Sequence, residues 1–92
     1  MLNQGYIAKG YQQITDLSAA VSFTVPAGTT LILITPETQD VRWRDDGTNP
    51  TASIGYPLAA GQELQYAAGQ MSSLKFIEQA ASAVLNVTYY GN

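Results

Sequence analysis

Apolar and polar residues alternate with a period of two through several short stretches of this chain. The clearest are AVSFTV at 20–25 and VLNVTYY at 84–90, where every second side chain is apolar. This alternation is typical of strands that bury one face and expose the other, and no stretch shows the 3.6-residue spacing of an amphipathic helix. The pattern therefore predicts an all-β chain in which Leu85, Val87 and Tyr89 face the core.

Turn signals separate these stretches, among them Pro26-Ala27-Gly28, Asp46-Gly47 and Ala60-Gly61. Short strands that recur about every 8–12 residues are typical of β-sandwiches and barrels. We expect strands at 11–15, 20–25, 30–35, 41–44, 51–54, 63–66, 74–78 and 84–90. The predicted fold is a small antiparallel β-sandwich or jelly roll of about seven or eight strands.

The stretch TLILIT at 30–35 is apolar on both of its faces. Leu31 and Leu33 would face one way, and Ile32 and Ile34 the other. One pair suits the core, while the other needs cover from the rest of the domain or from another subunit. We therefore count Ile32 and Ile34 among the candidate interface residues.

The stretch VRWRDDGTNP at 41–50 holds the only tryptophan and both arginines. Trp43 is predicted to face the core, while Arg42 and Arg44 point outward as candidates for salt bridges across strands or between subunits. Asp46 and Gly47 indicate a tight turn, and Pro50 extends the loop. Four residues serve as the signature of this part of the fold: Trp43, Asp46, Gly47 and Pro50.

Residues 1–10 are polar, contain two glycines and carry a single charge, Lys9. We expect them to form an extended N-terminal arm, with residues 11–92 forming one β-sandwich domain. Tyr6, Ile7 and Tyr11 are the candidate anchors of this arm on another subunit. A frayed terminus is the alternative.

Cysteine and histidine are both absent from the chain. Disulfides, thiolate metal sites and catalysis by Ser-His or Cys-His pairs are therefore excluded. Asp45 and Asp46 are neighbours that would point to opposite faces of a strand, so we assign them to the turn rather than to a pair of catalytic carboxylates. Asp40, Asp45 and Asp46 remain a possible cation site. No phosphate-binding loop or other cofactor motif is present, and we predict a protein that is not an enzyme and uses no cofactor.

The net charge of −3 at pH 7 argues against nucleic acid as a direct partner. The longest strictly apolar run, at 31–34, is far shorter than the about 20 residues that a transmembrane helix requires, so we expect no membrane partner. The first ten residues do not resemble a signal peptide. These features predict a protein that acts in the cytoplasm or in a particle assembled there.

Three stretches carry a resemblance to a known group of proteins: FTVPAGTTLILIT, QDVRWRDDGTNPTASIGYPLAAGQELQY and LKFIEQAASAVLNVTYY. They resemble small proteins encoded among the virion genes of tailed bacteriophages and prophages, whose β-sandwich character is similar to that of capsid cement, or decoration, proteins. The resemblance implies a homotrimer on the outer surface of the phage head, with the major capsid protein as partner, assembled in the host cytoplasm. A tail, fibre or neck component is an alternative. A further alternative is a carbohydrate- or receptor-binding module that uses the six tyrosines and Trp43 as a stacking platform.

Overall fold

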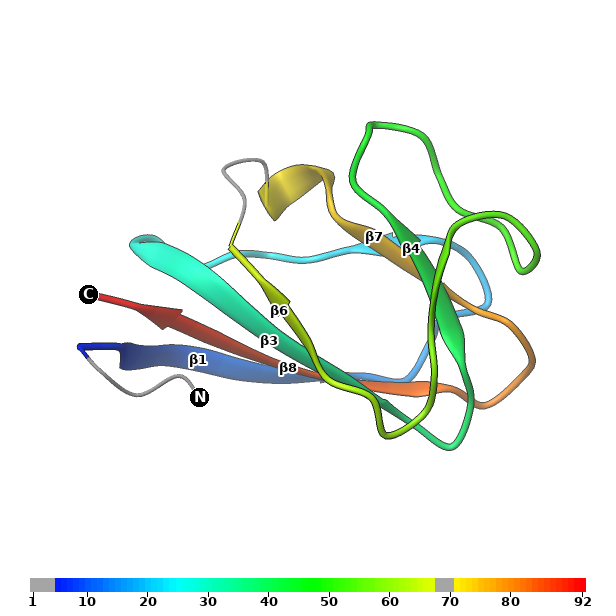
Figure 1. Ribbon diagram of the computed structural model, residues 1–92, viewed down its shortest axis with the longest axis horizontal. Coiled ribbons are helices and arrows are strands. Elements are labelled where there is room, and N and C mark those ends of the chain that lie inside the picture. The colour runs from blue at the N-terminus through cyan, green and yellow to red at the C-terminus, as the bar shows by residue number, and fades with distance from the viewer. Residues whose placement is uncertain (1–4, 68–70) are drawn as a thin grey trace.

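The computed structural model describes residues 5–67 and 71–92, and this part of the chain is all-β apart from one short turn of 3-10 helix (Figure 1). Within it, no helix is long and apolar enough to cross a membrane. The elements are β1 (Ile7–Ile14), β2 (Val21–Ser22), β3 (Thr29–Glu37), β4 (Val41–Arg44), β5 (Tyr56–Leu58), β6 (Leu64–Tyr66), η1 (Met71–Ser73), β7 (Lys75–Glu78) and β8 (Val84–Gly91).

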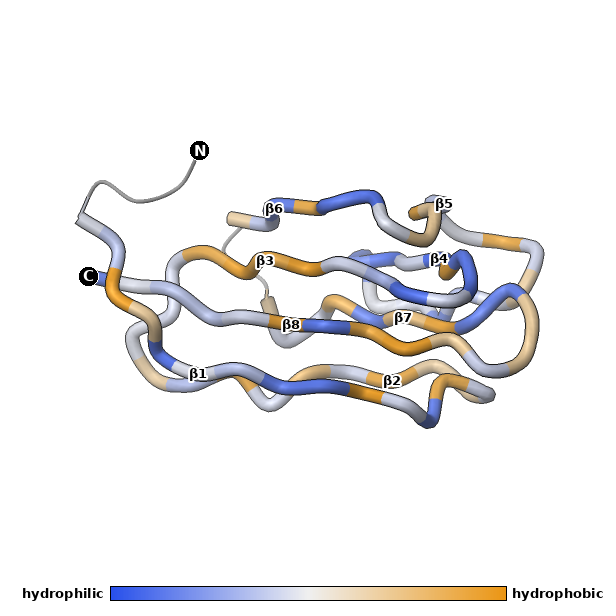
Figure 2. The backbone as a smooth tube through the Cα atoms, turned by 90° about the horizontal axis from the view of Figure 1, so that it is seen from below, coloured by the Kyte–Doolittle hydropathy of each residue, from blue (hydrophilic) through white to orange (hydrophobic). Residues whose placement is uncertain are grey.

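The strands form two four-stranded antiparallel sheets, with strand orders β1-β8-β3-β6 and β2-β7-β4-β5. The first strand pairs with the last, the second with the seventh, the third with the sixth and the fourth with the fifth. A long hairpin folded over on itself in this way is the jelly-roll topology. Figure 2 shows both sheets in the same order from bottom to top, with β1 and β2 at one side and β6 and β5 at the other. The predicted fold class is confirmed.

The core lies between the sheets and includes the side chains that the alternating pattern of the last strand assigns to it. Leu85 and Val87 are fully buried, and Tyr89 is 2% exposed. Phe23 stacks on Phe76 with ring centroids 5.3 Å apart, and this pair joins β7 to the segment that follows β2. The predicted inward face of the last strand is therefore confirmed.

Ile32 and Ile34 are fully buried in this same core. In the sheet, β3 lies between β6 and β8, and the second sheet covers its inner face. The prediction that these two residues contact another subunit is therefore wrong, because their own domain covers them. Leu31 and Leu33 face the other way, and of these Leu33 stays partly exposed.

The second sheet departs from the expected strand limits at two places. Residues 51–54 form a loop instead of a strand, and the strand β5 follows at Tyr56–Leu58. Pro57 is tolerated inside β5 because β5 is an edge strand, which pairs with β4 alone among the described strands. β2 is limited to Val21–Ser22, although Phe23 beyond it still points into the core.

The first strand begins within the segment that we expected to be an arm. Ile7 pairs with Gly91, and Gly10 pairs with Tyr89, so this part of residues 1–10 lies in the sheet. Residues 1–4 of the expected arm lie outside the described residues.

Candidate functional site

A hollow of about 300 Å³ lies at the end of β4, on the side of the sandwich where β5 and β6 form the edges of the two sheets. This volume is at the lower limit for small-molecule sites. The hollow is lined by Trp43, Arg44, Asp45, Asp46, Ile54, Gly55 and Tyr56. The stretch at 41–50 that stood out in the sequence thus supplies one wall, and the start of β5 with the loop before it supplies the other.

Trp43 connects this hollow to the core. It pairs directly with Tyr56 in the β4–β5 ladder, so both side chains share one face of the sheet, and their ring centroids are 5.3 Å apart at 33°. On its other sides Trp43 meets the edge of Tyr66 and the ring of Phe76. Its buried Nε1 finds no acceptor among the described residues. Trp43 therefore packs against the core as predicted, but it is only partly buried and also lines the hollow.

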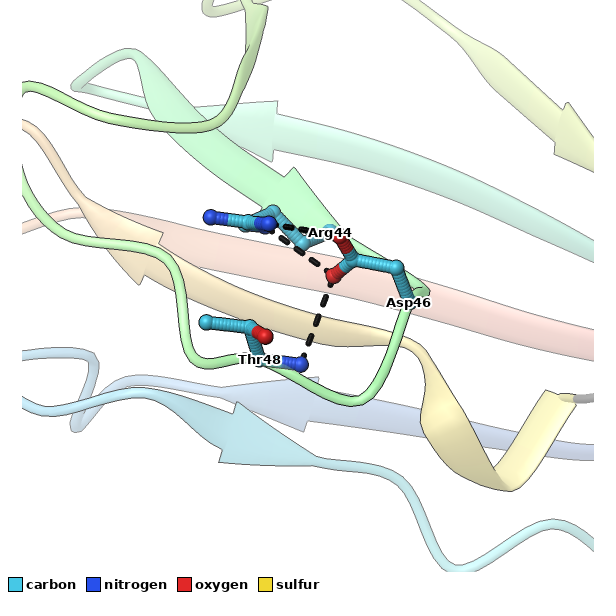
Figure 3. A network of polar contacts seen from close by, with 3 residues as sticks. All are labelled: Arg44, Asp46 and Thr48. Carbon is cyan, nitrogen blue, oxygen red and sulfur yellow. Dashed lines mark hydrogen bonds and ion pairs between the residues drawn. The ribbon is translucent and has the colours of Figure 1, made fainter.

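Arg44, Asp46 and Thr48 form a small polar network on one wall (Figure 3). Arg44 donates through Nε and Nη2 to the two carboxylate oxygens of Asp46, and the backbone N–H of Thr48 donates to Asp46 Oδ1 at 3.3 Å. The hydrogen bond from Arg44 lowers the pKa of Asp46, and the same bond raises the pKa of Arg44. Gly47 follows with φ +87°, a conformation that favours glycine. The predicted turn is confirmed.

Asp45 takes part in a separate contact. Its Oδ2 accepts a hydrogen bond of 2.6 Å from the hydroxyl of Tyr66, which belongs to the other sheet. Burial, followed by the hydrogen bond to Asp45, raises the pKa of Tyr66 to about 12. The two neighbouring aspartates therefore have different partners, as expected for residues that shape a turn.

The loop between β4 and β5 is held by side chains of neighbouring strands. Arg42 donates from Nη1 to the carbonyl oxygen of Gly55 at 2.8 Å and from Nε to that of Ala52 at 3.3 Å. Lys75 on β7 donates to Asn49 Oδ1 at 3.0 Å, and Pro50 within the loop is buried. Within the described residues Arg42 therefore binds the loop backbone and makes no salt bridge across strands. Its predicted contact with another subunit stays a prediction.

The ion pair within the described residues is Arg44–Asp46, which is local to the turn and does not cross strands. Of the predicted interface residues, Tyr6, Ile7 and Tyr11 lie at the opposite edge of the molecule, in or next to β1, and are 39%, 58% and 62% exposed. The hydroxyl of Tyr11 donates to Asn86 Oδ1 at 2.6 Å.

The sequence did not single out two side chains that line the hollow, those of Ile54 and Tyr56. Both are large, apolar and well exposed, at 58% and 68%. The signal that could have found Tyr56 is the alternation of Tyr56 and Leu58 around Pro57, which is easily overlooked because proline is rare inside strands.

The three aspartates considered for a cation do not converge. Asp40 Oδ1 accepts the backbone N–H of Ala60, while Asp45 and Asp46 bind Tyr66 and Arg44. Over residues 5–67 and 71–92, no group of three or more acidic, cysteine or histidine side chains could hold a metal ion. The chain matches no protein-family model, no curated protein and no solved structure.

Proposed function

We propose that this protein is a structural component of a tailed-phage virion, a capsid cement protein that associates with copies of itself on the outer head surface. The observation that supports this proposal best is the outer edge of β1. β1 is eight residues long, pairs only with β8 among the described strands, and exposes Ile7 and Tyr11.

An edge strand of this length presents unpaired backbone N–H and C=O groups to any strand that approaches. Soluble proteins usually protect such edges with several charges, proline or a very short strand. β1 contains no proline and one charged residue, Lys9, and a β-bulge between Ala8 and Gly10 interrupts its start. From Tyr11 to Ile14 its register with β8 is regular, so this part of the edge is the one open to pairing. A strand from a second copy can add to this edge through backbone hydrogen bonds, while Ile7 and Tyr11 supply apolar contact.

The fold and the family resemblance support the same proposal. Jelly rolls occur in viral capsid proteins and in lectins, so the fold by itself is compatible with a virion protein without specifying one. The resemblance of 23–35, 39–66 and 74–90 to phage virion proteins adds the expected setting: a homotrimer whose other partner is the major capsid protein.

The mass of the purified protein in solution tests the association. We expect an oligomer, with a trimer as the specific expectation, and a shift to monomer when Ile7→Lys places a charge on the β1 edge. Ile54→Lys is the matched control, because Ile54 is equally exposed at 58% but lies at the opposite edge. Both variants should melt like the parent protein.

Binding to phage heads that lack the protein, followed by imaging of the particle, tests the virion role. Density for the protein on the head surface is the expected result, whereas density on the tail, a fibre or the neck would replace the cement role with one of those positions. A protein that is monomeric and does not bind any part of the particle would contradict the proposal.

A further inference from the structure

We propose that the hollow beside Trp43 binds a single uncharged sugar residue, with the sugar ring stacked on Tyr56. This site goes beyond the proposed association through β1. It lies at the β5–β6 side of the sandwich, whereas β1 forms the opposite edge of its sheet.

The apolar wall of the hollow suits the C–H face of a sugar ring. Tyr56 is 68% exposed, yet its ring is backed by Trp43 at 5.3 Å, and Trp43 in turn packs against Phe76 in the core. Ile54, also exposed, lies on the same wall. An aromatic ring that is exposed but held by the core offers a large contact area at little cost in conformational entropy.

The polar wall offers partners for hydroxyl groups. A sugar hydroxyl both donates and accepts, so it can donate to the carboxylates of Asp45 and Asp46 and accept from the guanidinium of Arg44. Arg44 is already paired with Asp46, which leaves the charge of Asp45 uncompensated by any cation in the lining. An acidic sugar would be repelled there, and the site therefore favours uncharged sugars.

A cationic ligand fits the aromatic residues less well. Cages for ammonium groups place several ring faces around the charge. Here the rings of Trp43 and Tyr56 are tilted by 33° with centroids 5.3 Å apart, so Tyr56 covers the side of Trp43 that it packs against. A ring-shaped ligand that lies flat on Tyr56 uses this arrangement better than a compact cation.

The loop that forms the second wall is fixed before any ligand arrives. Arg42 binds two of its carbonyl oxygens, and the backbones of Thr51 and Ile54 bond each other in both directions. Gly55 has φ +143°, and a Cβ there would lie 3.1 Å from the Cβ atoms of both Arg42 and Pro50. The wall is therefore tightly packed behind the hollow, which leaves room for one small ring and not for a long chain.

A glycan array probed with the full chain, followed by titration of the bound glycans, tests this site. Trp43 is the only tryptophan, so its fluorescence reports directly on the hollow. We expect binding to glycans that end in an uncharged sugar, a shift of the Trp43 emission on titration, and no binding when the terminal residue is sialic acid. A blank array, a preference for acidic glycans, or a Trp43 response to tetramethylammonium but to no sugar would overturn the proposal.

Two pairs of variants separate the site from the rest of the surface. Tyr56→Ala should weaken binding at least tenfold, while Tyr56→Phe, which keeps the stacking ring, should stay within a few fold of the parent. Asp46→Ala should weaken binding, and Asp16→Ala, which removes an exposed carboxylate outside the hollow, should not. Melting curves identify any variant that has lost its fold. Equal affinity of Tyr56→Ala and the parent would contradict the assignment.

Discussion

At the scale of single residues, Trp43 is the link between stability and the candidate ligand site. Its ring contacts Phe76 in the core, Tyr66 in the facing sheet and Tyr56 at the surface. Its indole N–H is buried without an acceptor among the described residues, and an unpaired buried donor costs about 1–3 kcal/mol. The packing of the ring and the unpaired nitrogen therefore act on stability in opposite directions.

Two substitutions at Trp43 separate these effects. Trp43→Ala should lower the free energy of unfolding by about 3 kcal/mol, the lower end of the range for large aromatic residues, because the residue is only partly buried. Trp43→Phe should cost about 1 kcal/mol or less, since it keeps a ring in the core and removes the unpaired N–H. Denaturant unfolding measures both values. Equal losses in the two variants would show that ring packing does not determine the effect.

At the scale of elements, one glycine of β8 pairs with both neighbouring strands, β1 and β3. Gly91 pairs with Ile7 of β1 and with Thr29 of β3. The carbonyl of Gly28 lies against it so closely that a Cβ on Gly91 would overlap the oxygen. Only glycine allows the end of β8 to pass this turn, so the position constrains both neighbouring strands.

Gly91→Ala should therefore destabilise the protein by about 1–3 kcal/mol, the usual cost of forcing extra volume into a packed site. The matched control is Gly10→Ala in the same sheet, where a Cβ would meet only Pro26 Cγ at 3.6 Å and Tyr89 Cδ2 at 3.8 Å in ordinary contact. Thermal melting compares the two variants. A Gly91→Ala protein as stable as Gly10→Ala would mean that the end of β8 moves away without cost.

At the scale of the whole molecule, the hydrogen bond between Tyr66 and Asp45 joins the two sheets on the side where β6 and β5 form their edges. Tyr66 belongs to β6 in one sheet, and Asp45 follows β4 in the other. Because burial and this bond raise the pKa of Tyr66 to about 12, the folded state favours the protonated phenol. An unfolded chain would release that proton near pH 10, the usual tyrosine value.

The sign of the pH dependence follows from this difference. The folded pKa is raised, so the contribution of Tyr66 is complete below pH 10 and is lost as the pH rises from about 10 to 12. Between pH 9 and pH 11 we expect the parent to lose about 1 kcal/mol more stability than Tyr66→Phe, because this range covers only part of the titration and solvent screens part of the interaction. Urea unfolding at pH 9, 10 and 11 checks it. Parallel pH profiles for the two proteins would contradict the expected coupling.

The sequence predicted the fold class and most core-facing positions. Its predictions failed where the contacts of a residue depend on which other part of the chain packs against it. The alternation at 84–90 placed Leu85, Val87 and Tyr89 correctly, and Asp46-Gly47 formed the expected turn. Ile32 and Ile34 were misassigned because a strand that is apolar on both faces does not reveal which face its own domain covers. The salt bridges predicted across strands for Arg42 and Arg44 did not form, since Arg42 binds carbonyl groups of the loop before β5 and Arg44 binds Asp46 in the adjacent turn.

The sequence by itself determined the all-β architecture, because the period-two pattern and the turn residues act locally and favour strands over helices. Only the tertiary structure decided what surrounds Trp43. Tyr56 and Ile54 line the hollow because the loop between β4 and β5 folds back beside Trp43. Asp45 accepts a hydrogen bond from Tyr66 of the facing sheet. The strand order places β1 at an edge of its sheet. These contacts join residues that are distant in the chain, and the local pattern of apolar and polar residues does not specify which distant residues will be in contact.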